Sequence, residues 1–266
     1  MVQVSCEKRG MNRLAFVPSL VSPVGLTDHH KPWNKVKNSA YGKRQVKVIS
    51  LVKNDQVLEK LYKKVVVCIR QQSYSLALNT CRAVLEGGLD CLEITLTTPD
   101  AFELIHTVAS EYPQATIGAG TVLKPSQVKL AAKSGALFVM SPVLVQDVVQ
   151  ETIRQGLVAI PGAATPSEVF NCFVSGASLV KVFPVESFGG LSLVKTIGGP
   201  FPDIPLLPTS GITLSALPAY LSEKNVWAVG VSKQIVDSNS LTSENWKQIE
   251  ENARRWNCIV RDCGWK

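Results

Sequence analysis

The sequence predicts a single closed (β/α)8 barrel, the TIM-barrel architecture of the α/β class. After residue 53, short apolar segments rich in β-branched residues alternate with amphipathic helical segments, and the alternation occurs eight times. The apolar segments begin about 20 to 26 residues apart, which is the repeat length of a parallel βα unit. Eight such units fit a closed barrel, whereas an open doubly wound sheet more often has about five or six strands.

Each predicted strand is a short apolar run that ends in polar or turn residues. The second and sixth strands are unusual, because each carries one charged residue in apolar surroundings. In chain order the predicted strands are 64–70 (KVVVCIR), 89–96 (LDCLEITL), 115–122 (ATIGAGTV), 137–142 (LFVMSP), 157–162 (LVAIPG), 179–184 (LVKVFP), 205–211 (PLLPTSG) and 226–232 (VWAVGVS). In this fold the chemistry takes place at the rim where the strands end.

Signals for helix ends fall between these strands. Proline stands early in three predicted helices, and Thr165 with Glu168 forms a capping box. The starts are Thr98-Pro99-Asp100, Lys124-Pro125-Ser126 and Thr165-Pro166-Ser167-Glu168, and glycines mark ends at Gly87-Gly88, Gly135 and Gly176. The residues from about 237 onward, with Trp246 and Trp256, are predicted to form an amphipathic helix that closes the barrel.

The chain divides into a basic extension, residues 1–53, and the barrel domain, residues 54–266. The extension holds ten Lys or Arg residues and two acidic ones, a net charge of +8 against +7 for the whole chain. The barrel domain is therefore nearly neutral, which argues against nucleic-acid binding. A basic, acid-poor segment with scattered Ser, Pro and Asn is typical of an organellar transit peptide, with a plain basic tail as the alternative.

Composition also argues against membrane and metal-dependent functions. No apolar stretch reaches the roughly 18 residues that a membrane-spanning helix needs. The histidines, His29, His30 and His106, form no cluster with acidic residues, so the sequence predicts no metal and no cofactor. The seven cysteines contain no C-x-x-C pair, and we interpret them as reduced core residues, with a redox pair of Cys258 and Cys263 as the alternative.

Lys181 is the most informative residue, because it is the lone amine in the apolar strand 179–184. Burial disfavours the charged form of an amine, so such a lysine can be neutral near neutral pH and can attack a ketone. The resulting Schiff base is an electron sink for breaking the adjacent carbon–carbon bond. The alternative is a lysine whose stem is packed and whose head lies in water.

Glu93 is the matching acid in strand 89–96. Imine chemistry moves protons several times, and a carboxylic acid shielded by apolar side chains can accept and return them. Taken alone, Glu93 could instead be half of a structural ion pair. The two residues together favour catalysis.

Further candidate residues stand at the strand ends. Arg70 suits a planar carboxylate such as that of pyruvate, with a rim salt bridge as the alternative. Thr209-Ser210-Gly211 and Ser232 end the last two strands, where such barrels commonly bind phosphate, although ordinary turn glycine is the alternative. Gly118-Ala119-Gly120 lacks the rest of a dinucleotide fingerprint, and we interpret it as close packing against a bound ligand.

Ordered segments of the chain, from about residue 60 to about residue 236, resemble the 2-keto-3-deoxy-6-phosphogluconate (KDPG) aldolase family. This family also includes the 2-keto-4-hydroxyglutarate (KHG) aldolases. The segments that carry the resemblance are Glu86-Gly87-Gly88, Leu92-Glu93-Ile94-Thr95-Leu96, Gly118-Ala119-Gly120-Thr121-Val122, Ser141-Pro142, Ile160-Pro161-Gly162, Lys181-Val182-Phe183-Pro184 and Pro208-Thr209-Ser210-Gly211-Ile212.

The resemblance implies a lyase of the Entner–Doudoroff type: a class I, metal-independent aldolase on a (β/α)8 barrel, usually trimeric. It would cleave KDPG to pyruvate and glyceraldehyde 3-phosphate. Lys181 would form the Schiff base, and Glu93 would act as general acid and base through a water molecule. The other implied site residues are Arg70, Thr121, Pro142, Phe183 and Thr209 for the substrate, and Ser210, Gly211 and Ser232 for its phosphate.

Three departures from the family pattern bear on substrate choice. Thr97 stands where some members have Arg; others have Thr there and an Arg at the end of strand one, as Arg70 is here. Ser210 replaces a usual Gly, and Val231 stands where Gly is frequent. The alternatives are therefore an aldolase for KHG or for 2-keto-3-deoxy-6-phosphogalactonate and, from another class, a non-catalytic barrel that binds a phosphorylated metabolite.

The extension lies outside the family's bacterial pattern, which implies a plastid (chloroplast stroma) address, with the cytoplasm as the alternative. The sequence leaves open the cleavage site of the extension, the epimer preference and the oligomeric state.

Overall fold

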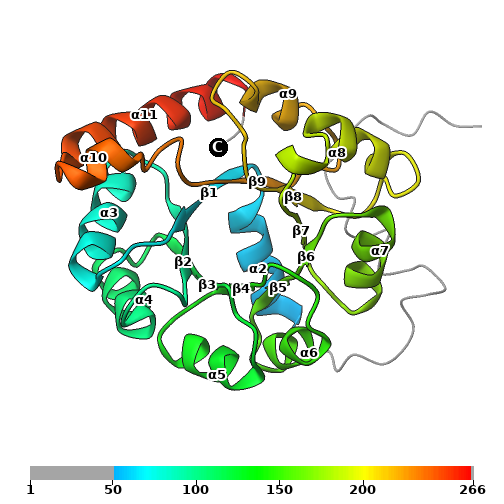
Figure 1. Ribbon diagram of the computed structural model, residues 1–266. Helices are drawn as coiled ribbons and strands as arrows, with labels where there is room; N and C mark the ends of the chain where they lie inside the picture. The colour runs from blue at the N-terminus through cyan, green and yellow to red at the C-terminus, as the bar shows by residue number, and fades with distance from the viewer. Residues whose placement is uncertain (1–50, 265–266) are drawn as a thin grey trace, which may run out of the picture. The chain divides into compact units, whose positions relative to one another are not determined.

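The strands form a ring of parallel neighbours surrounded by helices (Figure 1). The computed structural model describes residues 51–264, with side chains from residue 55 onward. These residues belong to one compact unit. Almost all of the predicted extension is outside the described residues, and the division at residue 53 stays a prediction.

Nine strand segments in the described residues confirm the eight predicted positions. They are β1 (Lys64–Ile69), β2 (Cys91–Thr95), β3 (Thr116–Gly120), β4 (Phe138–Met140), β5 (Val158–Ile160), β6 (Gly162–Ala163), β7 (Val180–Val182), β8 (Leu206–Pro208) and β9 (Ala228–Val231). The fifth predicted strand is divided into β5 and β6, because Pro161 has no N–H to donate to the ladder.

Two sheets join to make the ring. Their strand orders are β5-β4-β3-β2-β1-β9 and β6-β7-β8. On one side the chain runs from β5 through Pro161 into β6. On the other, parallel bridges pair Leu206 with Val226 and Thr209 with Gly230. This closure confirms the predicted (β/α)8 barrel and brings all strand ends to one rim.

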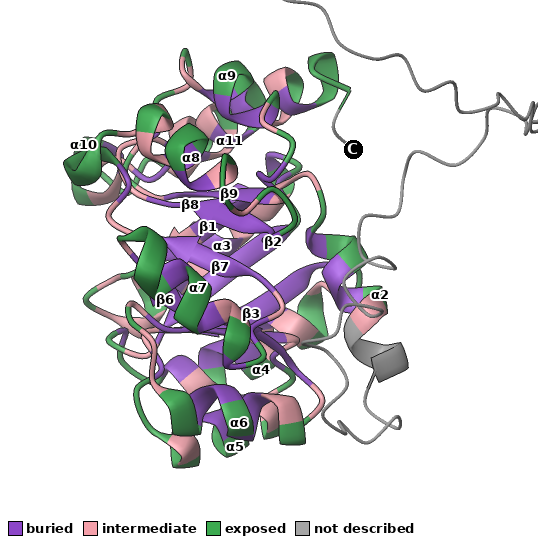
Figure 2. Ribbon diagram, turned by 90° about the vertical axis from the view of Figure 1, so that its right-hand side faces the viewer, coloured by how far each residue is buried: buried purple, intermediate pink, exposed green. Residues whose placement is uncertain are grey.

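The helices cover the outer face of the barrel. They are α3 (Tyr74–Glu86), α4 (Ala101–Glu111), α5 (Pro125–Lys133), α6 (Gln146–Arg154), α7 (Pro166–Val174), α8 (Leu191–Gly198), α9 (Leu217–Leu221), α10 (Ser238–Thr242) and α11 (Trp246–Asp262), with a 3-10 turn η1 (Glu186–Phe188). Figure 2 shows the strands buried between helices whose outer faces are exposed. No helix in residues 51–264 has the length and apolarity to cross a membrane.

The predicted helix boundaries hold in most places. Thr165 and Glu168 form the expected capping box of α7, with Glu168 accepting from the N–H groups of Ala164 and Thr165. The expected start at Thr98-Pro99-Asp100 is wrong, because α4 begins only at Ala101. Asp100 is the residue before the helix, and its φ of 52° is not helical.

Helices α2 (Leu51–Leu61) and α11 complete the barrel. Helix α2 lies across the end at which the strands begin: Leu58 and Leu61 are buried, and the Trp227 indole N–H donates to the Leu58 carbonyl at 3.1 Å (Figure 1). Helix α11 packs against α3 with Trp256 only 2% exposed, which confirms its predicted closing role. An added Cβ at Gly87 would lie 2.5 Å from Ala253 Cβ, so this glycine permits that close approach.

Candidate active site

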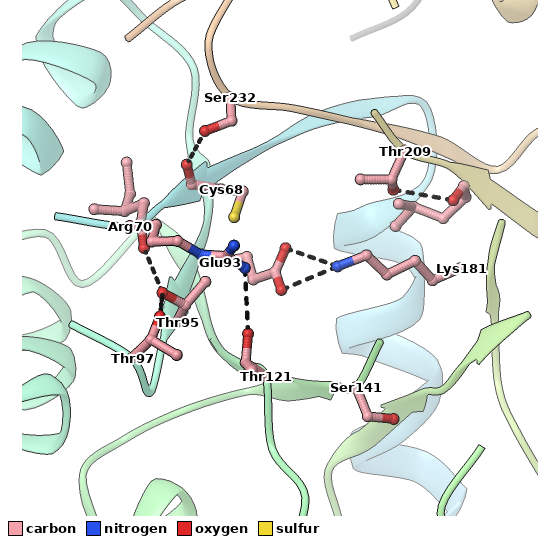
Figure 3. Close-up of polar contacts among 12 residues, drawn as sticks. Cys68, Arg70, Glu93, Thr95, Thr97, Thr121, Ser141, Lys181, Thr209 and Ser232 are labelled. Atoms are coloured by element: carbon pink, nitrogen blue, oxygen red, sulfur yellow. Dashed lines mark hydrogen bonds and ion pairs between the residues drawn. The ribbon is translucent and has the colours of Figure 1, made fainter. Parts of the chain in front are cut away.

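Lys181 and Glu93 point toward one another across the barrel interior (Figure 3). The Lys181 Nζ lies 3.2 Å from Oε1 and 3.3 Å from Oε2 of Glu93. The two residues are 7% and 2% exposed, so apolar strands shield them from water. A buried amine within hydrogen-bond distance of a buried carboxylate is the geometry of a nucleophile and its proton acceptor. The sequence predicted both residues, and the fold brings them together from β7 and β2.

Two glycines on β3 leave space for side chains in the barrel interior, Gly120 for Glu93 and Gly118 for Phe138. An added Cβ at Gly120 would lie 2.2 Å from Glu93 Oε1, and one at Gly118 would lie 2.3 Å from the Phe138 ring. These glycines thus allow close packing within the protein itself, and their predicted packing against a bound ligand stays a prediction.

Arg70 and Thr121 form a second polar group at the rim. The Arg70 Nη2 donates to the Thr121 Oγ1 at 3.5 Å (Figure 3). Arg70 is exposed, so its guanidinium can reach an incoming anion. Thr121 has a φ of 58°, a conformation in which a β-branched residue is strained, and such strain is concentrated at functional sites. A guanidinium and a hydroxyl side by side suit a carboxylate.

A group of threonine hydroxyls, not predicted from the sequence, fixes the loop after β2. The Thr95 Oγ1 donates to the Ile69 carbonyl at 3.2 Å and lies 2.9 Å from the Thr97 hydroxyl. Thr98 accepts from the Gln71 backbone N–H. Thr95 and Thr98 therefore tie the end of β2 and the loop after it to the end of β1, close to Arg70, and Thr97 holds the Thr95 hydroxyl.

Phe183 and Pro142 lie near the lysine. The Lys181 Nζ is 5.3 Å from the centre of the Phe183 ring, a distance typical of a cation–π contact. Lys181 pairs in register with Gly162, and an added Cβ at Gly162 would lie 2.1 Å from the Pro142 carbonyl oxygen. The Pro142 backbone therefore lies against Gly162, the strand partner of Lys181, because Gly162 has no side chain.

The predicted phosphate residues meet where β8 and β9 end. Thr209 is buried and pairs with Gly230, and the turn after it has φ values of 85° at Ser210 and 77° at Gly211. The Ser232 hydroxyl donates to the Cys68 carbonyl at 2.8 Å, so it would have to exchange this bond to bind a phosphate. The turn and the strand end lie side by side, as predicted.

Two residues near the site were missed by sequence reasoning. An added Cβ at Gly211 would lie 1.9 Å from Glu186 Oε2, so an acid lies against the predicted phosphate turn. Cys68 pairs in register with Glu93, and burial, followed by the charge of Glu93, raises the pKa of its thiol to about 12. Counting alternate residues back from Arg70 on β1 could have found Cys68. No local signal marked Glu186.

A metal site is not evident in the described part of the chain: no three His, Cys, Asp or Glu side chains there lie close enough together to hold an ion.

Comparisons with known proteins point to one family. A family model described as KDPG and KHG aldolase matches residues 55–252. The 2-dehydro-3-deoxy-phosphogluconate aldolase of Pseudoalteromonas atlantica is 36% identical over 179 residues, covering 67% of this chain and 83% of that protein. The KHG/KDPG aldolase of Escherichia coli is 34% identical over 178 residues, with the same coverage of 67% and 83%.

Solved structures agree. A KDPG aldolase from Legionella pneumophila, with pyruvate captured as a covalent carbinolamine intermediate, is similar with a TM-score of 0.69 and 31% identity over 75% of this chain and 97% of its own. The aldolase of Zymomonas mobilis with 3-phosphoglycerate has a TM-score of 0.67 and 30% identity over 76% of this chain and 93% of its own.

Proposed function

The chain belongs to the KDPG and KHG aldolase family, and on that premise we propose that it is a class I aldolase that cleaves KDPG to pyruvate and glyceraldehyde 3-phosphate. The observation that carries the proposal is the buried contact between Lys181 and Glu93, which places a nucleophilic amine beside a proton carrier. Two observations on relatives support it: curated relatives are named for this activity, and a similar solved structure holds a pyruvate carbinolamine.

The first half of the reaction is imine formation. A proton passed from Lys181 to Glu93 across their 3.2 Å contact leaves a neutral amine. The amine attacks the C2 ketone of the substrate to give a carbinolamine. Glu93 then returns its proton to the carbinolamine hydroxyl, which leaves as water, so that a protonated imine remains and Glu93 is a carboxylate again. Arg70 and Thr121 hold the substrate carboxylate, and Phe183 lies beside the imine nitrogen.

The second half is carbon–carbon cleavage. Glu93, through a water molecule, takes the proton of the C4 hydroxyl, and the C3–C4 bond breaks with its electron pair moving to the imine nitrogen. The aldehyde leaves, the enamine carbon accepts a proton, and water hydrolyses the pyruvate imine. One water molecule is released and one consumed, so lysine is regenerated without a metal or a cofactor.

Borohydride reduction in the presence of pyruvate tests this mechanism. We expect a single pyruvate-sized adduct on Lys181 in the mass map of the peptides and none on the surface Lys195. A folded protein that gives no adduct contradicts the aldolase and favours a non-catalytic barrel that binds a phosphorylated metabolite.

A second substrate class has a specific observation in its favour. The Glu186 carboxylate lies against Gly211, and like charge opposes the binding of a phosphate there. This favours KHG, which has no phosphate, as a substrate beside KDPG and its galactonate epimer. Comparing kcat/KM for the three compounds decides among them. Inorganic phosphate, added as an inhibitor, should slow the cleavage of the two phosphorylated compounds more than that of KHG. Equal inhibition of all three would contradict the idea that KHG binds without the phosphate site.

We also propose a homotrimer, as the family resemblance implies. The exposed apolar side chains of Leu130 on α5 and of Phe170 and Val174 on α7 are candidates for burial between subunits. Light scattering at several protein concentrations measures the mass, and a monomer at micromolar concentration contradicts the proposal.

For the cell address we propose the plastid stroma after removal of the extension. The support is the charge and composition of residues 1–53. Fusing residues 1–53 to a fluorescent protein, with the fluorescent protein alone as control, should give plastid import; fluorescence that stays in the cytoplasm contradicts this.

A further inference from the structure

Cys68 faces Glu93 from the neighbouring strand, although the mechanism above does not use it. The two residues are direct partners in the parallel register of β1 and β2. Side chains at paired positions lie on the same face of a sheet, so both point into the barrel. Figure 3 shows the sulfur beside the Glu93 side chain, with Thr121 on the opposite side.

The other flank of Glu93 is formed by glycines on β3. Its partner there is Gly118, over which the Phe138 ring lies, and its carboxylate lies where a Cβ of Gly120 would be. Glu93 therefore sits between the Cys68 side chain on β1 and the space that Gly120 leaves on β3. In this position both carboxylate oxygens contact the Lys181 amine, at 3.2 and 3.3 Å.

Cys68 fills its place without adding charge. Burial and the nearby carboxylate raise the pKa of its thiol to about 12, so the group is a neutral S–H at physiological pH. A second cation there would compete with Lys181 for Glu93, and an acid would repel it. The backbone of Cys68 is fixed as well, because its carbonyl accepts the Ser232 hydroxyl at 2.8 Å.

We propose that Cys68 is a positioning residue that holds Glu93 over Gly120 and within reach of Lys181. The inference rests on the proposed aldolase function, in which Glu93 carries the protons. A smaller residue at position 68 leaves space on β1 into which the Glu93 side chain can move. Proton transfer then slows, because its rate depends on placement to within a fraction of an ångström.

The test compares Cys68→Ala, Cys68→Val and a matched control, Cys81→Ala. Cys81 is fully buried, whereas Cys68 is half-buried, and Cys81 lies on α3, which packs on the outer face of the barrel, away from Glu93. We expect Cys68→Ala to lower kcat about 10-fold with KM within about 2-fold, since the carboxylate acts on the reacting atoms and not on substrate binding. Cys68→Val refills the space and should restore kcat to within about 3-fold of the wild type.

Four comparisons decide whether Cys68 positions Glu93. If Cys68→Ala and Cys81→Ala have the same kcat, or if Cys68→Val is as slow as Cys68→Ala, the positioning role is overturned. If Cys68→Ala does not fold, Cys68→Ser takes its place: it is smaller than valine, and turnover slower than that of Cys68→Val supports the role while equal turnover overturns it. A wild-type protein that neither traps pyruvate nor cleaves KDPG overturns the proposed function itself.

Discussion

The two ends of the substrate site are built from different parts of the fold. At the imine end, Lys181 and Glu93 are side chains of buried strands, positioned by register and by the glycines of β3. At the phosphate end, Ser210 and Gly211 form a turn whose backbone would bind the ligand. The family resemblance predicts that the chain keeps the family pattern at the first end and departs from it, at Ser210 and Val231, at the second. Turns tolerate such changes better than a closed sheet does, so specificity can vary while the chemistry stays fixed.

The largest expected effect is at the imine end. Lys181→Met removes the nucleophile, and activity should fall by at least about 1000-fold with complete loss of pyruvate trapping. It also leaves Glu93 buried without its cation, so the free energy of unfolding should drop by about 3 to 5 kcal/mol in urea titration. Adding Glu93→Gln should recover part of the stability and none of the activity; recovery of activity would contradict the assignment.

At the phosphate end we expect a change in substrate preference instead of a loss of activity. Glu186→Gln removes the charge beside Gly211 at nearly constant shape. The kcat/KM for KDPG should rise about 3- to 10-fold because a repulsion is removed, while turnover of KHG stays the same. An equal change for both substrates would mean that Glu186 acts on the imine end.

Each end of the site has one residue with a strained backbone, and we expect a smaller effect from removing that strain. Ser210 and Thr121 both have positive φ, a conformation that glycine adopts without strain. Glycine at either position should raise the free energy of unfolding by about 0.5 to 1 kcal/mol, measured by urea titration. Only Thr121→Gly should also raise KM several-fold, because it removes the hydroxyl beside Arg70. Unchanged KM in that variant would remove Thr121 from the carboxylate site.

The smallest expected effect on activity comes from thiol alkylation. The pKa of Cys68 and that of Cys172 are raised to about 12, mainly by burial, so neither is a thiolate at pH 8. Cys258 and Cys263 on or next to α11 are exposed. Among the cysteines of residues 51–264, iodoacetamide at pH 8 should modify these two first and leave the aldolase rate unchanged, as followed by mass mapping. Early modification of Cys68 with loss of activity would contradict its neutral state.

Sequence reasoning found what local patterns encode. A single charge in an apolar strand is visible in the sequence, so Lys181 and Glu93 were predicted, as were the strands that hold them. The contacts of Cys68 with Glu93 and of Glu186 with Gly211 depend on the register between strands and on turn geometry, which no short segment specifies. The break at Pro161 was missed because an apolar run around a proline still resembles one strand.

Helix α2 closes the end of the barrel where the strands begin, with its side chains Leu58 and Leu61 buried. Substrate and both products therefore share one opening, at the rim beside Arg70 and Ser232. The aldehyde is free as soon as the C3–C4 bond breaks, whereas the pyruvate fragment is still bound to Lys181 and lies deeper. The products must leave in a fixed order, aldehyde first, and product inhibition should follow that order: pyruvate, which alone can reload the empty enzyme, competes with the substrate.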